Sequence, residues 1–80
     1  MIDPVDIVGW IGAGMILMAY SLLSMGKVVA RGVPYQLLNI GGATGLLTNA
    51  WVREAWPLVG LNLVWIGIGI YVLATRRRAA

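Results

Sequence analysis

The fold is decided by residues 7–25, which read IVGWIGAGMILMAYSLLSM and contain no charged side chain. Two further stretches share this property, residues 32–52 and residues 55–75. Each is about 20 residues long, and a helix of this length, rising about 1.5 Å per residue, crosses a hydrocarbon core about 30 Å thick. A charge at the centre of that core costs at least about 2.5 kcal/mol, so such charge-free runs are typical of membrane-spanning helices.

The composition supports a membrane location. The chain has 80 residues, of which 60% are hydrophobic and 11% are charged, whereas a soluble domain is about half apolar and about a quarter charged. A soluble fold of this size leaves much of its surface in water and could not cover so much apolar area. The composition therefore predicts an integral membrane protein and excludes disorder, collagen and a nucleic-acid-binding arm.

Prolines and capping residues mark the ends of the three runs. Pro4, Pro34 and Pro57 each begin a run, and proline suits the first turn of a helix. Asp3 is expected to cap the first helix, and Gly26 to end it in the left-handed conformation. The acidic start differs from the basic start of a signal peptide, so the first run is expected to stay in the mature protein. The predicted fold class is all-α, a three-helix membrane bundle in a single domain, residues 1–80, with helices at residues 4–25, 34–52 and 57–75.

The distribution of lysine and arginine predicts the orientation. One end of the bundle would hold the N-terminus and residues 53–57, with one such residue, and the other would hold residues 27–31 and the C-terminal tail, with five. The positive-inside rule then places the N-terminus outside and the C-terminus in the cytoplasm of a bacterial inner membrane. In the tail, Arg76, Arg77 and Arg78 are expected either to contact anionic lipid headgroups or to act only as a stop-transfer anchor.

Small residues predict where the helices pack. In lipid, close packing depends on small side chains and a few hydrogen bonds. The second run has the densest glycine cluster, in which Gly41 and Gly45 are four residues apart. We therefore expect this helix to lie where two neighbours approach closely. Trp65, near the middle of the third run, is interpreted as a packing anchor or, alternatively, as a lipid-facing residue.

Asn49 and Asn62 lie on opposite sides of the short turn between the second and third helices. At 1.5 Å per residue their depths agree within about 3 Å. Two interpretations remain open: a hydrogen bond between the two amides, or a shared polar substrate site.

Gln36 and Asn39 are three residues apart and share a helix face. Their depth matches that of Tyr20 and Tyr71. The four residues form a predicted polar cluster that could satisfy backbone groups, bind a polar ligand or meet a partner.

Several kinds of chemistry lack the residues they need. The chain contains no histidine and no cysteine, so imidazole and thiolate metal ligands, His-ligated haem and Ser-His or Cys-His pairs are excluded. No acidic residue lies inside a charge-free run, so a proton relay or carboxylate cation site has no candidate. We expect no enzyme activity, no cofactor, no metal and no nucleic-acid partner.

The sequence resembles a family of short bacterial three-helix membrane proteins. The resemblance rests on DIVGWIGA at residues 6–13, YQLLNIG at residues 35–41, AWP at residues 55–57 and LN at residues 61–62. That family is distantly similar to PQ-loop half-transporters of the SemiSWEET type and to the membrane domain at the start of some lipid A biosynthesis proteins. The resemblance implies a half-bundle that dimerises around a pathway, with Gln36 and Asn39 as its polar residues. Tyr35 separates Pro34 from Gln36, so the Pro-Gln pair itself is not present.

Three hypotheses for function follow. The first is an accessory subunit that packs on a larger membrane complex, such as a respiratory or photosynthetic one. The second is a SemiSWEET-like homodimer that transports a small polar solute. The third is a lipid-binding protein. Three helices cannot enclose a pathway alone, and no coupling-ion site is apparent, so the accessory role is preferred.

Overall fold

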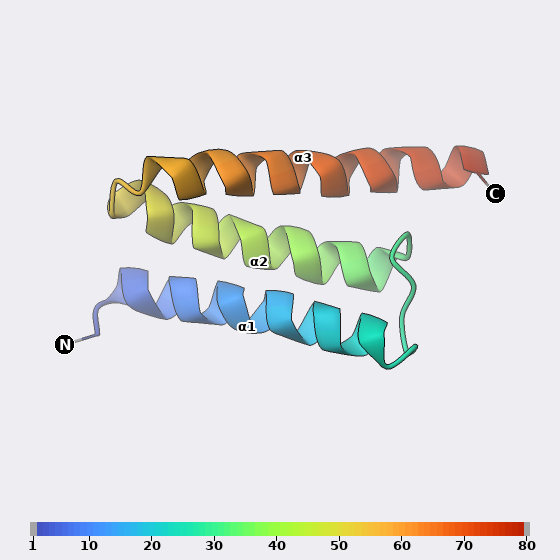
Figure 1. Ribbon diagram of the computed structural model, residues 1–80, viewed down its shortest axis with the longest axis horizontal. Coiled ribbons are helices and arrows are strands. Elements are labelled where there is room, and N and C mark those ends of the chain that lie inside the picture. Colours follow the sequence, from blue (N-terminus) through green and yellow to red (C-terminus); the bar gives the residue numbers. More distant parts are fainter. Residues whose placement is uncertain (1, 80) are drawn as a thin grey trace.

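The chain folds into three helices joined by two short connections. The computed structural model describes residues 2–79, with side chains described through Arg76. Its elements are α1 (Pro4–Ser24), α2 (Val33–Val52) and α3 (Trp56–Ala79) (Figure 1). The all-α, three-helix expectation is confirmed. α3 continues about one turn beyond residue 75, because arginine and alanine both favour a helix.

α1 is capped at both ends by residues that the sequence marks. The Asp6 backbone N–H donates to the Asp3 carboxylate at 3.0 Å, and the Asp3 N–H donates back to Asp6 at 3.2 Å. At the other end Gly26 has φ +74°, and the Lys27 N–H donates to the Leu22 carbonyl at 3.0 Å. This is a Schellman ending, in which glycine takes the left-handed conformation without steric cost.

α2 ends in the same way without a glycine. Glu54 occupies the left-handed position with φ 57°, and the Ala55 N–H donates to the Ala50 carbonyl at 2.9 Å. A side chain in this conformation costs about 1–2 kcal/mol. The rings of Trp51 and Trp56 meet edge to face across this turn, with centroids 5.3 Å apart. Aromatic packing therefore accompanies a strained turn.

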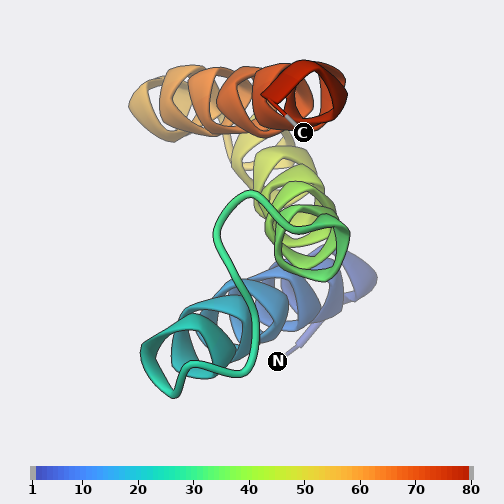
Figure 2. The ribbon, with the colours of Figure 1, turned by 90° about the vertical axis from the view of Figure 1, so that its right-hand side faces the viewer.

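The helices form an open layer with α2 in the middle. α2 packs against α1 on one side and α3 on the other, and no packing between α1 and α3 occurs within residues 2–79 (Figures 1 and 2). The molecule measures 46 × 24 × 16 Å. The arrangement thus differs from a bundle in which every helix contacts the other two.

Glycines allow the backbones of α1 and α2 to touch. A Cβ atom added at Gly12 would lie 2.6 Å from the Gly42 carbonyl oxygen, and one added at Gly42 would lie 2.7 Å from the Gly12 oxygen. A Cβ at Gly45 would lie 3.0 Å from the Val8 oxygen. No side chain fits at Gly12 or Gly42 without separating the helices, so the contact depends on their absence.

Two helices are long and apolar enough to cross a membrane. They are Pro4–Ser24, with mean hydropathy 1.8, and Trp56–Arg76, with mean hydropathy 2.0. α2 has 20 residues and no charge, so its length would suffice. It falls short in hydropathy because it carries glutamine, asparagine and threonine. Of the three predicted membrane-spanning helices, α1 and α3 are therefore apolar enough to cross a membrane, and a membrane span at α2 stays a prediction.

Candidate functional site

The most polar interior of the layer lies between α2 and α3. Gln36 and Asn39 are only 5% and 8% exposed, and they are the buried polar residues of the described chain. They border a groove of about 250 Å³. Its lining residues are Ala30, Tyr35, Gln36, Asn39, Trp65 and Ile68. α2 thus turns its polar face towards α3 at this level.

The two amides are held in different ways. The Gln36 Nε2 donates to the Ala30 carbonyl at 2.7 Å, which leaves its Oε1 as an acceptor. Asn39 Oδ1 accepts a hydrogen bond from the Trp65 indole Nε1 at 2.9 Å. Trp65 therefore links α3 to α2 through a polar contact, although the residue is 43% exposed.

Gln36 Oε1 is buried and has no hydrogen-bond partner among the described residues. It faces α3 at Gly69, where an added Cβ would lie 3.0 Å from this oxygen. Leaving a buried acceptor unpaired costs about 1–3 kcal/mol. The oxygen could accept a hydrogen bond from water or from a hydroxyl or amine of a ligand. Within residues 2–76, no group of three His, Cys, Asp or Glu side chains is placed to hold a metal ion.

The predicted four-residue polar cluster is not assembled. Tyr20 is 63% exposed and Tyr71 is 67% exposed, and neither lines the groove that holds Gln36 and Asn39. Tyr20 belongs to α1, which lies on the far side of α2 from α3 (Figure 2). Tyr20 and Tyr71 match Gln36 and Asn39 in depth along the helices, but an equal depth does not place side chains on faces that meet. Tyr35 lines the groove instead. Its position next to Gln36 in the sequence could have indicated that it belongs to this site.

The predicted hydrogen bond between Asn49 and Asn62 is also absent. Asn49 Nδ2 donates to the Val5 carbonyl of α1 at 2.9 Å, and Asn62 Nδ2 donates to Leu58 of its own helix at 2.8 Å. Asn49 lies over Gly9, where a Cβ would come within 2.7 Å of its amide nitrogen. Asn49 therefore links α2 to α1 rather than to α3.

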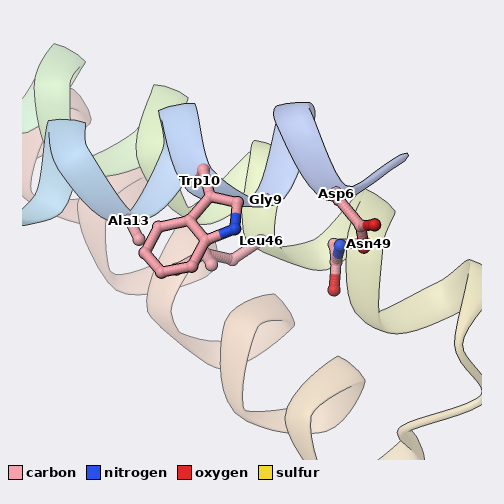
Figure 3. A pocket seen from close by; sticks show the side chains of 6 residues that line it. All are labelled: Asp6, Gly9, Trp10, Ala13, Leu46 and Asn49. Carbon is pink, nitrogen blue, oxygen red and sulfur yellow. The ribbon is translucent and has the colours of Figure 1, made fainter. Parts of the chain in front are cut away.

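A second groove, of about 310 Å³, opens where Asn49 meets α1. Trp10 covers part of it, and the Asn49 amide oxygen points away from α1 (Figure 3). The lining residues are Asp6, Gly9, Trp10, Ala13, Leu46 and Asn49. This groove is shallow and lies at the end of the layer that carries the N-terminus.

Gly41 and Gly45 have unequal surroundings. Gly45 lies against the α1 backbone, whereas a Cβ at Gly41 would meet only the terminal methyl of Met15, at 2.7 Å. That methyl ends a flexible side chain and can move. The tightest approach to α1 is made by Gly42 and Gly45, a spacing of three residues that the sequence argument did not select.

Arg53 joins the N-terminus to the α2–α3 turn, a contact that the sequence analysis missed. Its Nη2 lies 3.0 Å from Asp3 Oδ1 and 2.6 Å from Asp6 Oδ1. The Asp6 backbone N–H and then the Arg53 guanidinium lower the pKa of Asp3, and both aspartates raise the pKa of Arg53. The sequence could have indicated this contact, because it places Arg53 and the two aspartates, which carry opposite charges, at the same end of the bundle.

The other end of the layer is basic. Arg76 Nε donates to the Arg31 carbonyl at 2.9 Å, and Arg31 Nη2 donates to the Thr75 hydroxyl at 3.1 Å. Arg77 and Arg78 lie within α3, and their side chains are outside the described residues. The part of the lipid-contact prediction that depends on these two side chains stays a prediction.

One comparison with known proteins relates this chain to others. No curated protein and no solved structure matches it. A protein-family model matches residues 5–80. That range includes all of α2 and the residues of both grooves. The chain therefore belongs to the family that this model defines, over nearly its whole length.

Proposed function

We propose that the protein is a non-enzymatic, multi-pass protein of a bacterial inner membrane. In this proposal it packs as an accessory subunit on a larger membrane assembly, such as a respiratory or photosynthetic complex. The observation that carries the proposal is the open layer, in which α3 contacts only α2 among the described residues. A three-helix unit that leaves both faces of its layer uncovered is suited to packing against other helices.

The apolar surface supports the membrane location. Large hydrophobic side chains are exposed along α1 and α3, among them Ile11, Leu17, Val64 and Ile70. In water such a surface would be an aggregation site, whereas in lipid it needs no cover. The five-to-one excess of lysine and arginine supports an outside N-terminus and a cytoplasmic C-terminus.

The outer face of α3 is the docking surface in this proposal. Gly60 and Gly67 are seven residues apart, about two helical turns, so they share one face. A Cβ at either would meet nothing within 4 Å. Both are exposed, whereas Gly69 faces α2. Glycine in a helix favours close approach of a neighbour and is otherwise unfavourable, which supports a partner helix here.

The experiment is native mass spectrometry of the tagged protein after extraction from its own membranes in mild detergent. A stoichiometric complex with other chains is expected. Gly67→Leu should reduce the partner recovered while leaving the three helices intact. Gly14→Leu is the matched control, because that glycine of α1 also faces open space. Recovery of the protein only as a monomer or a homodimer would refute the accessory role.

The orientation has a separate test. A reporter that is active only in the cytoplasm should work when fused after Ala80 and fail when fused before Met1. The opposite pattern would show that the positive-inside argument does not hold here.

A second function is favoured by one observation, the unpaired Gln36 Oε1 in the groove between α2 and α3. The distant similarity to half-transporters would make this groove part of a solute pathway between two copies of the chain. Liposomes that contain only this protein would then take up a small polar solute, and Asn39→Ala would abolish uptake without loss of the dimer. Absence of flux for every solute tried, with the dimer intact, would count against it.

A further inference from the structure

The basic end of the layer holds two arginines close together. Arg76 Nε donates to the Arg31 backbone carbonyl, and the Arg31 guanidinium donates to Thr75, the residue before Arg76 in α3. The Thr75 hydroxyl is itself fixed, because it donates to the Tyr71 carbonyl at 2.9 Å. The loop before α2 and the end of α3 thus bring two positive side chains together.

No carboxylate offsets these charges within the described side chains. The acidic residues of the sequence are Asp3, Asp6 and Glu54, and all belong to the opposite end of a molecule 46 Å long (Figure 1). The salt bridges of residues 2–76 both involve Arg53. Two guanidinium groups at one end of the molecule without a counter-charge favour an anion, and their planar N–H groups suit phosphate.

An apolar groove begins beside Arg76. It has a volume of about 320 Å³ and is lined by Val33, Leu73, Ala74 and Arg76. Its apolar members come from the start of α2 and from the last turns of α3. A phosphate held at the arginines would therefore have an apolar surface directly beside it.

We propose that Arg31 and Arg76 bind the phosphate of an anionic phospholipid, with an acyl chain in the groove of Val33, Leu73 and Ala74. The groove favours a lipid over free phosphate, since a free ion has no use for an apolar surface. The two uncompensated arginines favour an anionic headgroup over a zwitterionic one. The proposal rests on the membrane location given above.

The test uses the full-length protein in nanodiscs of equal phosphatidylglycerol and phosphatidylcholine. The lipid that the protein retains is quantified by mass spectrometry. Phosphatidylglycerol should be enriched over phosphatidylcholine. Arg31→Gln and Arg76→Gln should each lower the enrichment about tenfold, which corresponds to the loss of about 1.5 kcal/mol for a hydrogen bond to a charged group.

Two controls separate a defined site from general surface charge. Lys27→Gln removes one charge from the same loop as Arg31, and it should change the enrichment less than twofold. Ala74→Leu fills the groove without altering charge, and it should reduce enrichment as the arginine variants do. Equal losses in Lys27→Gln and Arg76→Gln, or full enrichment in Ala74→Leu, would overturn the proposal.

Further measurements keep the outcome interpretable. Arg76→Lys keeps the charge and loses the forked geometry, so it should bind more weakly than the native protein even if Arg76→Gln fails to fold. Glycerol phosphate, the headgroup without acyl chains, should not displace the retained lipid at millimolar concentration; displacement would indicate a site for a free anion.

Resistance to alkaline extraction from vesicles tests membrane insertion itself. Failure to insert would overturn the location and the site, whereas insertion without lipid preference would overturn the site alone.

Discussion

Replacing Gly12 by alanine tests whether the backbone contact between α1 and α2 holds the layer together. The added Cβ would lie 2.6 Å from the Gly42 oxygen, whereas ordinary contact begins near 3.4 Å. Neither neighbour is a flexible side chain, because the nearest atoms are the Gly42 carbonyl and the Leu46 backbone nitrogen. The helices must therefore separate locally by the difference, about 0.8 Å.

The cost follows from that separation. A gap of about 0.5–1 Å removes a quarter to a half of the attraction of each atomic contact across an interface. Overpacking of this kind costs about 1–3 kcal/mol, and alanine returns at most about 1 kcal/mol through its higher helix propensity. With the full gain from alanine, we expect Gly12→Ala to lower the free energy of unfolding by up to about 2 kcal/mol. Gly14→Ala should be neutral or stabilising by up to about 1 kcal/mol, since nothing lies within 4 Å of its Cβ position.

The assay is equilibrium unfolding in mixed micelles with increasing dodecyl sulfate, followed by circular dichroism. Tryptophan fluorescence gives a second probe, because Trp51 and Trp56 are in contact at the α2–α3 turn. The free energy of unfolding of Gly41→Ala should lie between those of the other two variants, since its Cβ meets only the mobile end of Met15. Equal stability of Gly12→Ala and Gly14→Ala would refute the idea that the backbone contact matters.

Three further results are expected. Glu54→Gly should stabilise the protein by about 0.5–1 kcal/mol in the same assay, because it relieves the left-handed φ of 57°, and loss of stability would contradict this. Asp3 has a lowered pKa in the folded protein, so its carboxylate stabilises the fold at pH values above its unfolded pKa. This stabilisation should fall as the pH decreases through the folded pKa. In an acid titration of the free energy of unfolding, Asp3→Asn should lack this loss of stability. Asn39→Ala should cost about 0.6–2 kcal/mol and change the emission of Trp65, whose indole N–H loses its acceptor; unchanged emission and stability would show that this bond is not maintained.

The helices and their ends could be predicted from sequence because their causes are local. Asp3 caps α1, and Gly26 ends it, for reasons contained within a few residues of each position. Charge-free runs likewise define helix length without any knowledge of neighbours. The close approach of α2 to α1 was foreseen from the glycine content of α2, since small residues mark close approach.

Pairings between side chains could not be predicted, because depth along a helix does not determine which face points to which neighbour. Asn49 and Asn62 share a depth, yet Asn49 faces α1 and Asn62 bonds within its own helix. The prediction that Tyr20 lies beside Gln36 and Asn39 was wrong for the same reason. Choosing Gly42 over Gly41 needs a rotation of about 100° about the axis of α2, and only the three-dimensional structure supplies it.

The distribution of polar partners around α2 has a consequence for biogenesis. Asn49 finds its acceptor at Val5 in α1, whereas Asn39 pairs with Trp65 in α3. In the proposed membrane location, a helix of this modest hydropathy would partition weakly from the translocon into lipid by itself. During synthesis α1 emerges first, so α2 can join it through the glycine crossing while its α3-facing side still lacks a partner. We expect α2 to remain beside the translocon until α3 is made, so that the last helix synthesised completes the release of the middle one into the bilayer.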